Sequence, residues 1–479
     1  MSRRWQSVLL IAAMLLASGT CADQAWSNGA AASGGQWSSV TLEPRVRNGE
    51  AVAVAGGKVL IAGGLAYQYP TSFVVDQVDI YDSAVRQWST GRLSQARSGA
   101  ASATVGSQIL FAGGYLQDTI TTSAAVDIYD TATDQWSTAS LSGPRNSVSA
   151  VTVGSLVMFA GGNAQGLRNP SAAVDIYNSE TGQWSTATLS EPRTALPKAT
   201  VGSQVLFVGG TTDRAYNSDA VDVYNSATGQ WSSARLAHPD TTPSVIVVGT
   251  QVLITTHAIN VPLVVDIYDS ATGQWSQATI AQTYYGLPDV VTVGTQAVFS
   301  IYGAVASYDS VTRQWSTIPI PYGKAGSATA SVGTMAVFVD RSSTPTPAGP
   351  TTPTPETSGS TLVANVYDTA TGQWSSQPLS QGRMNFAVAT VGTQVLFAGG
   401  SIYPPEFRTK MIHFDAVDIY DVATGTASTS TLALARETPR VETVGTQVLF
   451  IGGTIGCTGC PVDRADLVVD VYDSAAGQR

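Results

Sequence analysis

Eight tryptophan residues recur in one register along this chain of 479 residues. Each closes a phrase like the Tyr177-Asn178-Ser179-Glu180-Thr181-Gly182-Gln183-Trp184 of the third repeat. The eight are Trp37, Trp88, Trp136, Trp184, Trp231, Trp275, Trp315 and Trp374. The gaps between them are 51, 48, 48, 47, 44, 40 and 59 residues, which is too long for helical hairpins and matches one four-stranded propeller blade. We therefore predict an all-β fold built from repeated blades.

The third repeat shows the expected strand pattern. Residues 149–153 alternate small and β-branched side chains and predict a strand a, and Gly154-Ser155 suits a tight hairpin turn. The apolar run 156–160 predicts a buried strand b that ends at Gly161-Gly162. A variable loop, a strand c at 173–177 and a strand d around Trp184 complete the repeat.

Glycine doublets, each followed by a Tyr and then the Trp, give the chain its resemblance to a known family. The doublets are Gly63-Gly64, Gly113-Gly114, Gly161-Gly162, Gly209-Gly210, Gly399-Gly400 and Gly452-Gly453. This combination resembles the kelch repeat over nearly the whole chain after its first residues, and the resemblance implies a single closed β-propeller. Repeats five to seven depart from it, with Thr255-Thr256, Ser300-Ile301 and Val339-Asp340 at the doublet position.

The two ends of the chain predict how the ring closes. The sequence stops at Gln478-Arg479, just before the next Trp would come, and Gly35-Gln36-Trp37 supplies the missing phrase. We expect residues 36–41 to form strand d of the last blade, because this pairing removes two exposed sheet edges. This count gives nine blades, with Ala427 at the Trp position of the eighth. Eight blades is the alternative, if repeats six and seven do not form two.

The predicted propeller covers residues 23–479 and follows an export signal at 1–22. Arg3 and Arg4 precede an apolar run, and Thr20 and Ala22 suit cleavage after Ala22. Cys21 leaves lipid attachment open as an alternative. Residues 341–360, rich in Pro and Thr, predict a disordered insertion between strands b and c of the seventh blade.

Charge limits the classes of partner. Only 12% of the residues are charged, and the net charge of −10 lacks the basic field that nucleic acids attract. No segment after the signal is apolar enough to span a membrane. We expect a secreted or envelope protein that is a monomer, without nucleic-acid partners or a transmembrane anchor.

A basic column is the main functional signal. Aligned on the glycine of the turn between strands a and b, the position nine residues earlier is basic in seven of nine repeats, with Asp240 and Tyr285 in the other two. The seven are Arg47, Arg97, Arg145, Arg193, Lys324, Arg383 and Arg436. This connection between strand d and the next strand a lies on the same face as the b–c loops. Its resemblance to kelch propellers that read acidic peptides implies an anion-receiving face; the structural alternative is that each Arg bonds backbone carbonyls or an acid.

Other positions support weaker hypotheses. The variable b–c loops hold Tyr67, Gln68, Tyr69, Arg168, Asn169, Arg214, Tyr216 and residues 403–413, and variable loops on a rigid scaffold commonly bind ligands. One Asp stands two residues before the strand c Tyr in seven repeats, at Asp79, Asp127, Asp175, Asp222, Asp266, Asp418 and Asp470. One carboxylate per blade is too few for calcium, so a buried structural role is favoured. Cys457 and Cys460 predict a local disulfide.

These features favour a binding module over an enzyme. The three histidines, His238, His257 and His413, lie in separate repeats without metal-ligand spacing, and we expect no catalytic residues, metal or cofactor. The leading hypothesis is a non-catalytic module that binds a protein or glycan, with an acidic ligand as one expectation. The alternative is an enzyme on a carboxylated sugar, similar to the kelch propellers that act on sialic acid.

Overall fold

The computed structural model describes residues 35–68, 71–117, 121–164, 169–213, 217–240, 243–256, 262–283, 288–301, 304–319, 328–342, 361–402, 411–455 and 464–475. Within these ranges the secondary structure consists of strands and turns, without a helix. The chain is all-β, as its sequence predicts.

Repeat 3 shows how the sequence builds one sheet. Strands β13 (Ser149–Val153) and β14 (Leu156–Ala160) pair through a tight turn in which Gly154 has φ 57°, a left-handed conformation that glycine adopts without steric cost. Strand β16 (Ala173–Asn178) pairs with β14, and β17 (Gln183–Thr188) pairs with β16. The bounds predicted for strands a and b are confirmed.

Eight sheets within the described ranges have four antiparallel strands in this order. In repeats 1 to 4 they are β2 (Ala51–Ala55), β3 (Lys58–Ala62), β6 (Gln77–Asp82) and β7 (Gln87–Arg92); β8 (Ala101–Val105), β9 (Gln108–Ala112), β10 (Ala125–Asp130) and β11 (Gln135–Ser140); β13, β14, β16 and β17; and β18 (Lys198–Val201), β19 (Gln204–Val208), β20 (Ser218–Asn225) and β21 (Gln230–Asp240). In repeats 5 to 8 they are β22 (Ser244–Val248), β23 (Gln251–Thr255), β24 (Pro262–Asp269) and β25 (Gln274–Thr283); β26 (Val290–Val293), β27 (Gln296–Ile301), β28 (Ala304–Asp309) and β29 (Gln314–Pro319); β30 (Ala328–Val332), β31 (Met335–Ser342), β32 (Thr361–Asp368) and β33 (Gln373–Gln381); and β34 (Ala387–Val391), β35 (Gln394–Ala398), β38 (Ala416–Asp421) and β39 (Thr426–Thr431).

The two ends of the chain share a larger sheet. Its path includes β40 (Arg440–Val444), β41 (Gln447–Ile451), β43 (Arg464–Asp473) and β1 (Gln36–Asn48), and it continues through β4 (Leu65–Gln68) and β5 (Thr71–Val74), with β42 (Thr454–Ile455) paired to β43. Residues 36–41 pair in register with residues 473–468, so the N-terminal strand does pair with the last repeat as predicted. The strand extends beyond the predicted bounds, because Arg47 and Asn48 pair with β4 of repeat 1.

Pairs of short strands lie in the connections on one side of the sheets. β12 (Arg145–Asn146) pairs with β15 (Asn163–Ala164), and β36 (Ser401–Ile402) pairs with β37 (Ile412–His413). In repeat 7, β31 pairs with β32 through Arg341 and Ser342. The first two residues of the predicted 341–360 insertion therefore belong to a strand, and residues 343–360 lie outside the described ranges.

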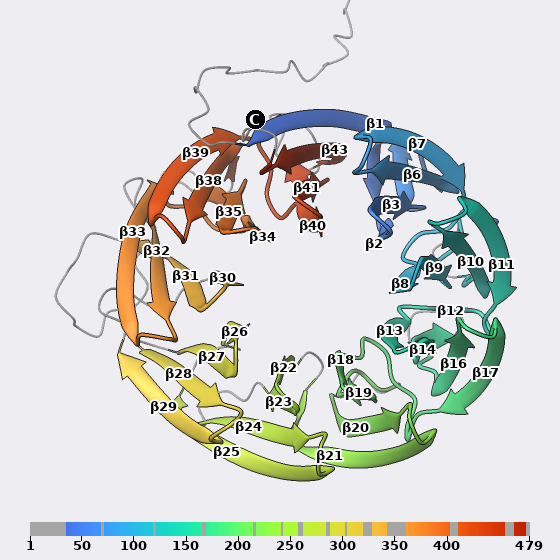
Figure 1. Ribbon diagram of the computed structural model, residues 1–479. Helices are drawn as coiled ribbons and strands as arrows, with labels where there is room; N and C mark the ends of the chain where they lie inside the picture. Colours follow the sequence, from blue (N-terminus) through green and yellow to red (C-terminus); the bar gives the residue numbers. More distant parts are fainter. Residues whose placement is uncertain are drawn as a thin grey trace, which may run out of the picture.

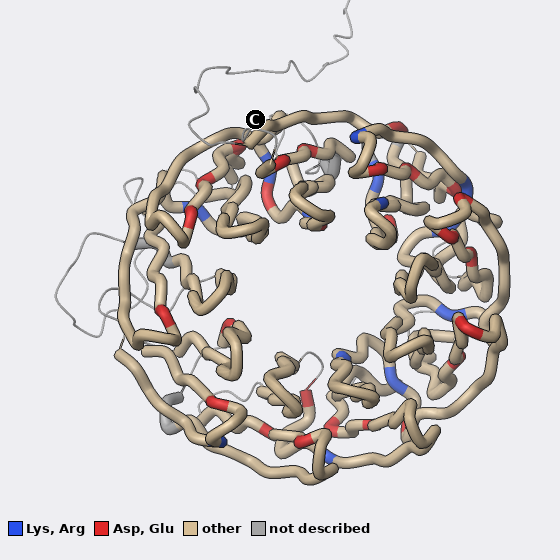
Figure 2. The backbone as a smooth tube through the Cα atoms, in the orientation of Figure 1, with Lys and Arg blue, Asp and Glu red and all other residues tan. Residues whose placement is uncertain are grey.

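The sheets are arranged in a ring with the a strands on the inner side and the d strands on the outside (Figure 1). Neighbouring sheets bury apolar residues between their faces: Val52 and Ile61 of repeat 1 pack in one cluster with Leu449 and Val471 of repeat 9. Charged residues are few and spread around the ring, and the strands nearest its centre are largely uncharged (Figure 2). Apolar contacts between sheets therefore form the core.

Candidate functional site

The predicted basic column lies at the corner where each d–a connection meets its sheet. In repeat 2, Arg97 Nη2 donates to Asp127 Oδ2 at 2.6 Å and to the carbonyl oxygen of Phe111 at 3.0 Å. Its Nη1 donates to the carbonyl oxygen of Gln95 at 3.0 Å. The second carboxylate oxygen of Asp127 accepts the amide of Ser94 at 2.7 Å. Both side chains are enclosed, with 0% of Arg97 and 2% of Asp127 exposed.

The same buried ion pair recurs in six repeats. Its members are Arg47 with Asp79, Arg97 with Asp127, Arg145 with Asp175, Arg193 with Asp222, Arg383 with Asp418, and Arg436 with Asp470. Each Arg precedes strand a and each Asp lies on strand c, so the pair joins the inner connection to the third strand of the same sheet. The structural role favoured for these six aspartates is confirmed.

Enclosing these charges has an electrostatic cost. Burial lowers the pKa of the Arg145, Arg193, Arg383 and Arg436 guanidinium groups, and the paired carboxylates oppose this shift only in part. Burial also raises the pKa of the Asp470 carboxyl, against the effect of Arg436. Removing one partner of such a pair costs about 3–5 kcal/mol, because the other charge stays buried and uncompensated.

The six described arginines of the basic column therefore lie one in each repeat, and they do not form a single exposed cluster. Arg47 and Arg436 keep Nε and Nη1 without a hydrogen-bond partner among the described residues, but these atoms are enclosed. Lys324 and Tyr285 lie outside the described ranges, and Asp240 is buried. The anion-receiving role stays a prediction, whereas the structural alternative is supported by the contacts of all six arginines.

The glycine doublets complete the same corner. The amide of Gly114 donates to the carbonyl oxygen of Arg145, in the following repeat, at 2.9 Å, and Gly400 makes the equivalent bond to Arg436 at 2.8 Å. A Cβ on Gly114 would lie 2.6 Å from the carbonyl oxygen of Ser98. The six repeats with doublets are the six with the ion pair. This coincidence was the sequence signal that Arg, Asp and Gly-Gly form one structural unit.

The remaining Asp of the predicted column has other partners. Asp266 accepts hydrogen bonds from Gln277 Nε2 at 2.8 Å and from the amide of Ala237 at 3.0 Å. Within the described ranges, no group of three His, Cys, Asp or Glu side chains is placed to hold a metal ion. Cys457, Cys460 and His257 lie outside those ranges, and so the disulfide stays a prediction.

The b–c loops present apolar side chains to solvent. Strands β4 and β5 form a hairpin in which Tyr67 is 47% and Phe73 36% exposed. Gln117, from the b–c loop of repeat 2, braces this hairpin by accepting the amide of Val74 at 3.0 Å and donating to the carbonyl of Ser72 at 2.9 Å. Ile412, in the b–c hairpin of repeat 8, is 44% exposed. Of the other loop residues predicted to bind, Tyr69, Arg168, Arg214, Tyr216 and residues 403–410 lie outside the described ranges.

One comparison identifies the repeat. A family model described as the kelch motif matches residues 96–140. This segment contains Arg97, Gly113-Gly114, Asp127 and Trp136, which make the corner and the outer packing of repeat 2. This match and the strand-only described structure support a kelch-repeat β-propeller.

Kelch repeats generally mediate protein binding. The comparison with curated proteins found no match for this chain. Among the residues that the structure describes, no helix has the length and apolar character needed to cross a membrane.

Proposed function

We propose that this kelch protein is an exported, closed nine-bladed propeller that binds a protein partner through its b–c loop face, without catalysing a reaction. Ring closure is supported by the pairing of β1 with β43. Nine blades rather than eight are supported by repeats 6 and 7, whose strands β26–β29 and β30–β33 belong to two separate sheets. Export is proposed from the signal predicted at residues 1–22.

The observation that carries the binding proposal is the braced hairpin β4–β5. Tyr67 and Phe73 are among the few large apolar side chains that the described structure leaves exposed. Aromatic side chains are enriched at protein interfaces, because they bury a large area with few rotatable bonds. The hairpin is held in place by β1 on one strand and by Gln117 on the other, so its aromatics sit on a rigid support. The face formed by the b–c loops is therefore the surface that we expect to contact a partner protein, because it presents these exposed aromatic side chains.

The test compares two pairs of exposed apolar residues on opposite faces. Val85 and Val311 are 60% and 73% exposed in the turns between strands c and d. The Tyr67→Ser/Phe73→Ser variant should lose partners that cross-link to the wild-type chain in envelope and culture fractions. The Val85→Ser/Val311→Ser variant should retain them. Purified partner and chain then give the affinity by calorimetry, and equal affinities of the two double variants would contradict the proposal.

Two further measurements address the rest of the proposal. N-terminal sequencing of material recovered outside the cytoplasm should begin at Asp23 if the predicted signal is cleaved after Ala22. Intact protein found only in the cytoplasm would overturn the export proposal. Acidic peptides and sialylated sugars, included in the same calorimetry, examine whether the ligand is acidic.

A further inference from the structure

The outer strand of repeat 8 lacks the residue that fills this position elsewhere. In eight repeats the strand c Tyr stands directly across from a strand d Trp, as Tyr129 does from Trp136. The Tyr and Trp ring centroids of these pairs lie 4.9–5.1 Å apart. In repeat 8 the residue across from Tyr420 is Ala427. The tilted ring pair is therefore incomplete at one place in the propeller.

Each Trp occupies the joint with the preceding repeat. Trp184 packs in one cluster with Ala139, and Trp231 packs with Ala187. Ala139 and Ala187 each stand three residues after the Trp of the preceding repeat. The same position before repeat 8 is Gln377, a polar residue. Both sides of the joint between repeats 7 and 8 therefore differ from the other joints. Repeat 8 has Ala427 in place of the Trp, and repeat 7 has Gln377 in place of a small or apolar residue.

Arginine side chains cross two other joints of the ring. Arg86 in repeat 1 makes an ion pair with Asp473 of repeat 9, and Arg313 in repeat 6 makes one with Asp269 of repeat 5. Each of these arginines stands two residues before the Trp of its repeat, where repeat 8 has Gly425 and repeats 3, 4, 5 and 7 also have Gly. No side chain from this position bridges the joint between repeats 7 and 8.

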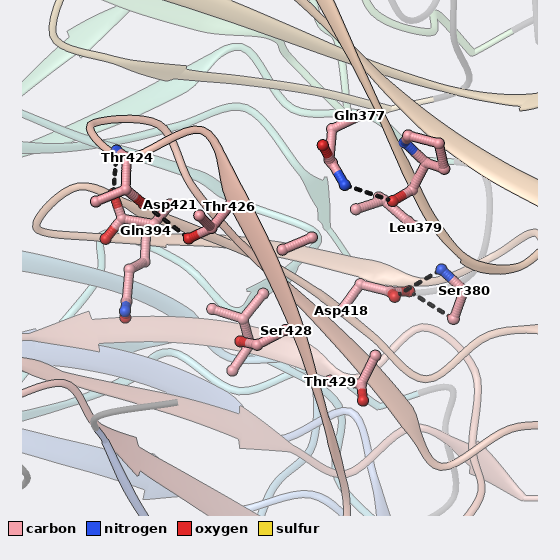
Figure 3. Close-up of a pocket in the computed structure, with 13 residues that line it drawn as sticks. Gln377, Leu379, Ser380, Gln394, Asp418, Asp421, Thr424, Thr426, Ser428 and Thr429 are labelled. Carbon is pink, nitrogen blue, oxygen red and sulfur yellow. Dashed lines mark hydrogen bonds between the residues drawn. The ribbon is translucent and has the colours of Figure 1, made fainter. Parts of the chain in front are cut away.

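The joint between repeats 7 and 8 has a larger cavity, on the outer side of the ring, than the two joints at which both a Trp and an Arg line the space. Between repeats 7 and 8 its volume is about 710 Å³, against about 360 Å³ at the joint that holds Trp88 and about 260 Å³ at the joint that holds Trp315. Gln377 and Leu379 line one wall, and Thr426, Ser428 and Thr429 line the other (Figure 3). The volume falls in the range of small-molecule sites.

The lining is polar and contains no positively charged side chain. Asp421 accepts the amides of Ala423 and Thr424 and the hydroxyl of Thr393. Asp418 is bound by Arg383 and Ser380. Arg383 compensates the charge of Asp418, whereas the partners of Asp421 are neutral donors. An anionic ligand would therefore find no positive charge among the residues that line this cavity.

Four uncharged groups in the same cavity retain hydrogen-bonding capacity. Gln394 uses its Oε1 to accept the Tyr472 hydroxyl at 2.8 Å, which leaves its amide nitrogen available to donate. Gln377 uses its Nε2 to donate to the carbonyl of Pro378 at 3.2 Å, which leaves its amide oxygen available to accept. The hydroxyls of Ser428 and Thr429 can do both, and no bond to another described residue occupies them. The apolar Leu379, Ile419 and Ala427 line the same cavity.

We propose that this cavity binds a sugar ring of a neutral glycan. A pyranose presents hydroxyls that both donate and accept, together with a small apolar face, and it carries no charge. The amides, hydroxyls and apolar side chains that line the cavity match each of these properties. The site lies on the outer side of the ring and shares no residue with the β4–β5 hairpin, so it is a second binding surface beside the proposed protein-binding face.

The experiment is saturation-transfer NMR of the purified chain with cellotriose, maltotriose, chitotriose and mannotriose as probes, followed by titration of those that respond. Ala427→Trp restores the repeat pattern and should abolish binding or weaken it at least tenfold. Val85→Trp, which adds the same side chain on an exposed turn away from the cavity, should leave the affinity unchanged. Gln377→Leu and Ser428→Ala should each weaken binding several-fold at an unchanged melting temperature, which keeps the test valid if Ala427→Trp fails to fold.

Several outcomes would overturn this proposal. One is the absence of saturation transfer from all four sugars, and another is binding that survives both Ala427→Trp and Gln377→Leu. Binding of an indole-bearing peptide in place of the sugars, lost in Ala427→Trp, would assign the cavity to an aromatic side chain. None of these outcomes affects the Tyr67 and Phe73 test, because the two sites have separate residues.

Discussion

The amide of Gly162 donates to the carbonyl oxygen of Arg193 at 3.1 Å, across the boundary between two neighbouring repeats. The Arg193 side chain turns back into its own sheet and pairs with Asp222. One residue thus anchors its sheet through its guanidinium group and the preceding sheet through its backbone. Within one repeat, the Arg also contacts the doublet directly, because Arg193 Nη1 donates to the carbonyl oxygen of Gly209 at 2.7 Å, which connects the doublet and the Arg of the same repeat.

Gly161→Ala should destabilise the propeller more than Gly154→Ala in the same repeat. Both glycines have positive φ, 63° and 57°, so an added Cβ costs about 1–2 kcal/mol at either position. At Gly161 it would also meet the Arg193 carbonyl and lie 2.9 Å from Leu196, whereas at Gly154 it would meet nothing within 4 Å. Overpacking adds about 1–3 kcal/mol. Equal losses by chemical denaturation would contradict the close-contact role of the doublet.

Asp127→Asn should cost about 3–5 kcal/mol of unfolding free energy, because it leaves Arg97 charged and enclosed. The control is Asp76→Asn. The partner of Asp76 is Arg92, which is 75% exposed, so the loss of this ion pair should cost under about 1 kcal/mol of unfolding free energy. Arg97→Leu/Asp127→Leu should lose less than Asp127→Asn alone, since no charge is left unpaired. An Arg97→Ala variant that keeps its stability but loses an acidic ligand would restore the anion-receiving hypothesis.

The periodic features of this fold were readable from the sequence. Small and β-branched alternation predicted β13, an apolar run predicted β14, and the missing final Trp predicted the pairing of residues 36–41 with the last repeat. These features depend on local spacing and on edges that must be covered. They are therefore visible without coordinates.

The corner was harder to predict, because its two charged residues are distant in sequence. Arg145 and Asp175 are separated by two strands and a loop whose length varies between repeats, so their alignment as two columns did not show that they touch. The spacing of residues along the sequence does not show which side chains are exposed. The arginines were therefore interpreted as a possible exposed ring of hydrogen-bond donors, whereas they are buried. Ala427 was recognised as a missing Trp, but the cavity is also lined by Gln377 of the preceding repeat, which only the packing of two sheets brings close to Ala427.

Deleting residues 23–42 should lower the melting temperature of the whole propeller, because it removes Trp37 and the strand that pairs with β43. Loss of a packed Trp alone costs about 3–5 kcal/mol, so a fall of about 5 °C or more is expected. Deleting residues 23–34, which leaves β1 complete, is the matched control. A melting temperature that is equal for both truncations would show that the strand does not stabilise the ring.

Asp473 should make stability depend on pH in the acid range. Burial of this carboxyl opposes ionisation, but hydrogen bonds from the Ala475 amide, Thr446 and Gln447, together with the charge of Arg86, lower its pKa below the ordinary value. A carboxyl with a lowered pKa binds fewer protons in the folded state. Its contribution is therefore complete above the unfolded pKa, near pH 4, and is lost as the pH falls through the lower folded value.

Asp473→Asn should accordingly lower the unfolding free energy at pH 7 by about 1.5–3 kcal/mol, the range for hydrogen bonds to a charged group. The difference from wild type should stay constant down to about pH 5 and shrink below about pH 4, as the wild-type carboxyl takes up its proton. Ser474→Ala removes the neighbouring hydrogen bond to the Thr446 carbonyl without removing a titrating group. Its difference from wild type should not change with pH. Denaturant titrations from pH 7 to pH 3 measure both curves, and a difference for Asp473→Asn that grows as the pH falls would show that this carboxyl does not stabilise the joint between repeats 9 and 1 through its charge.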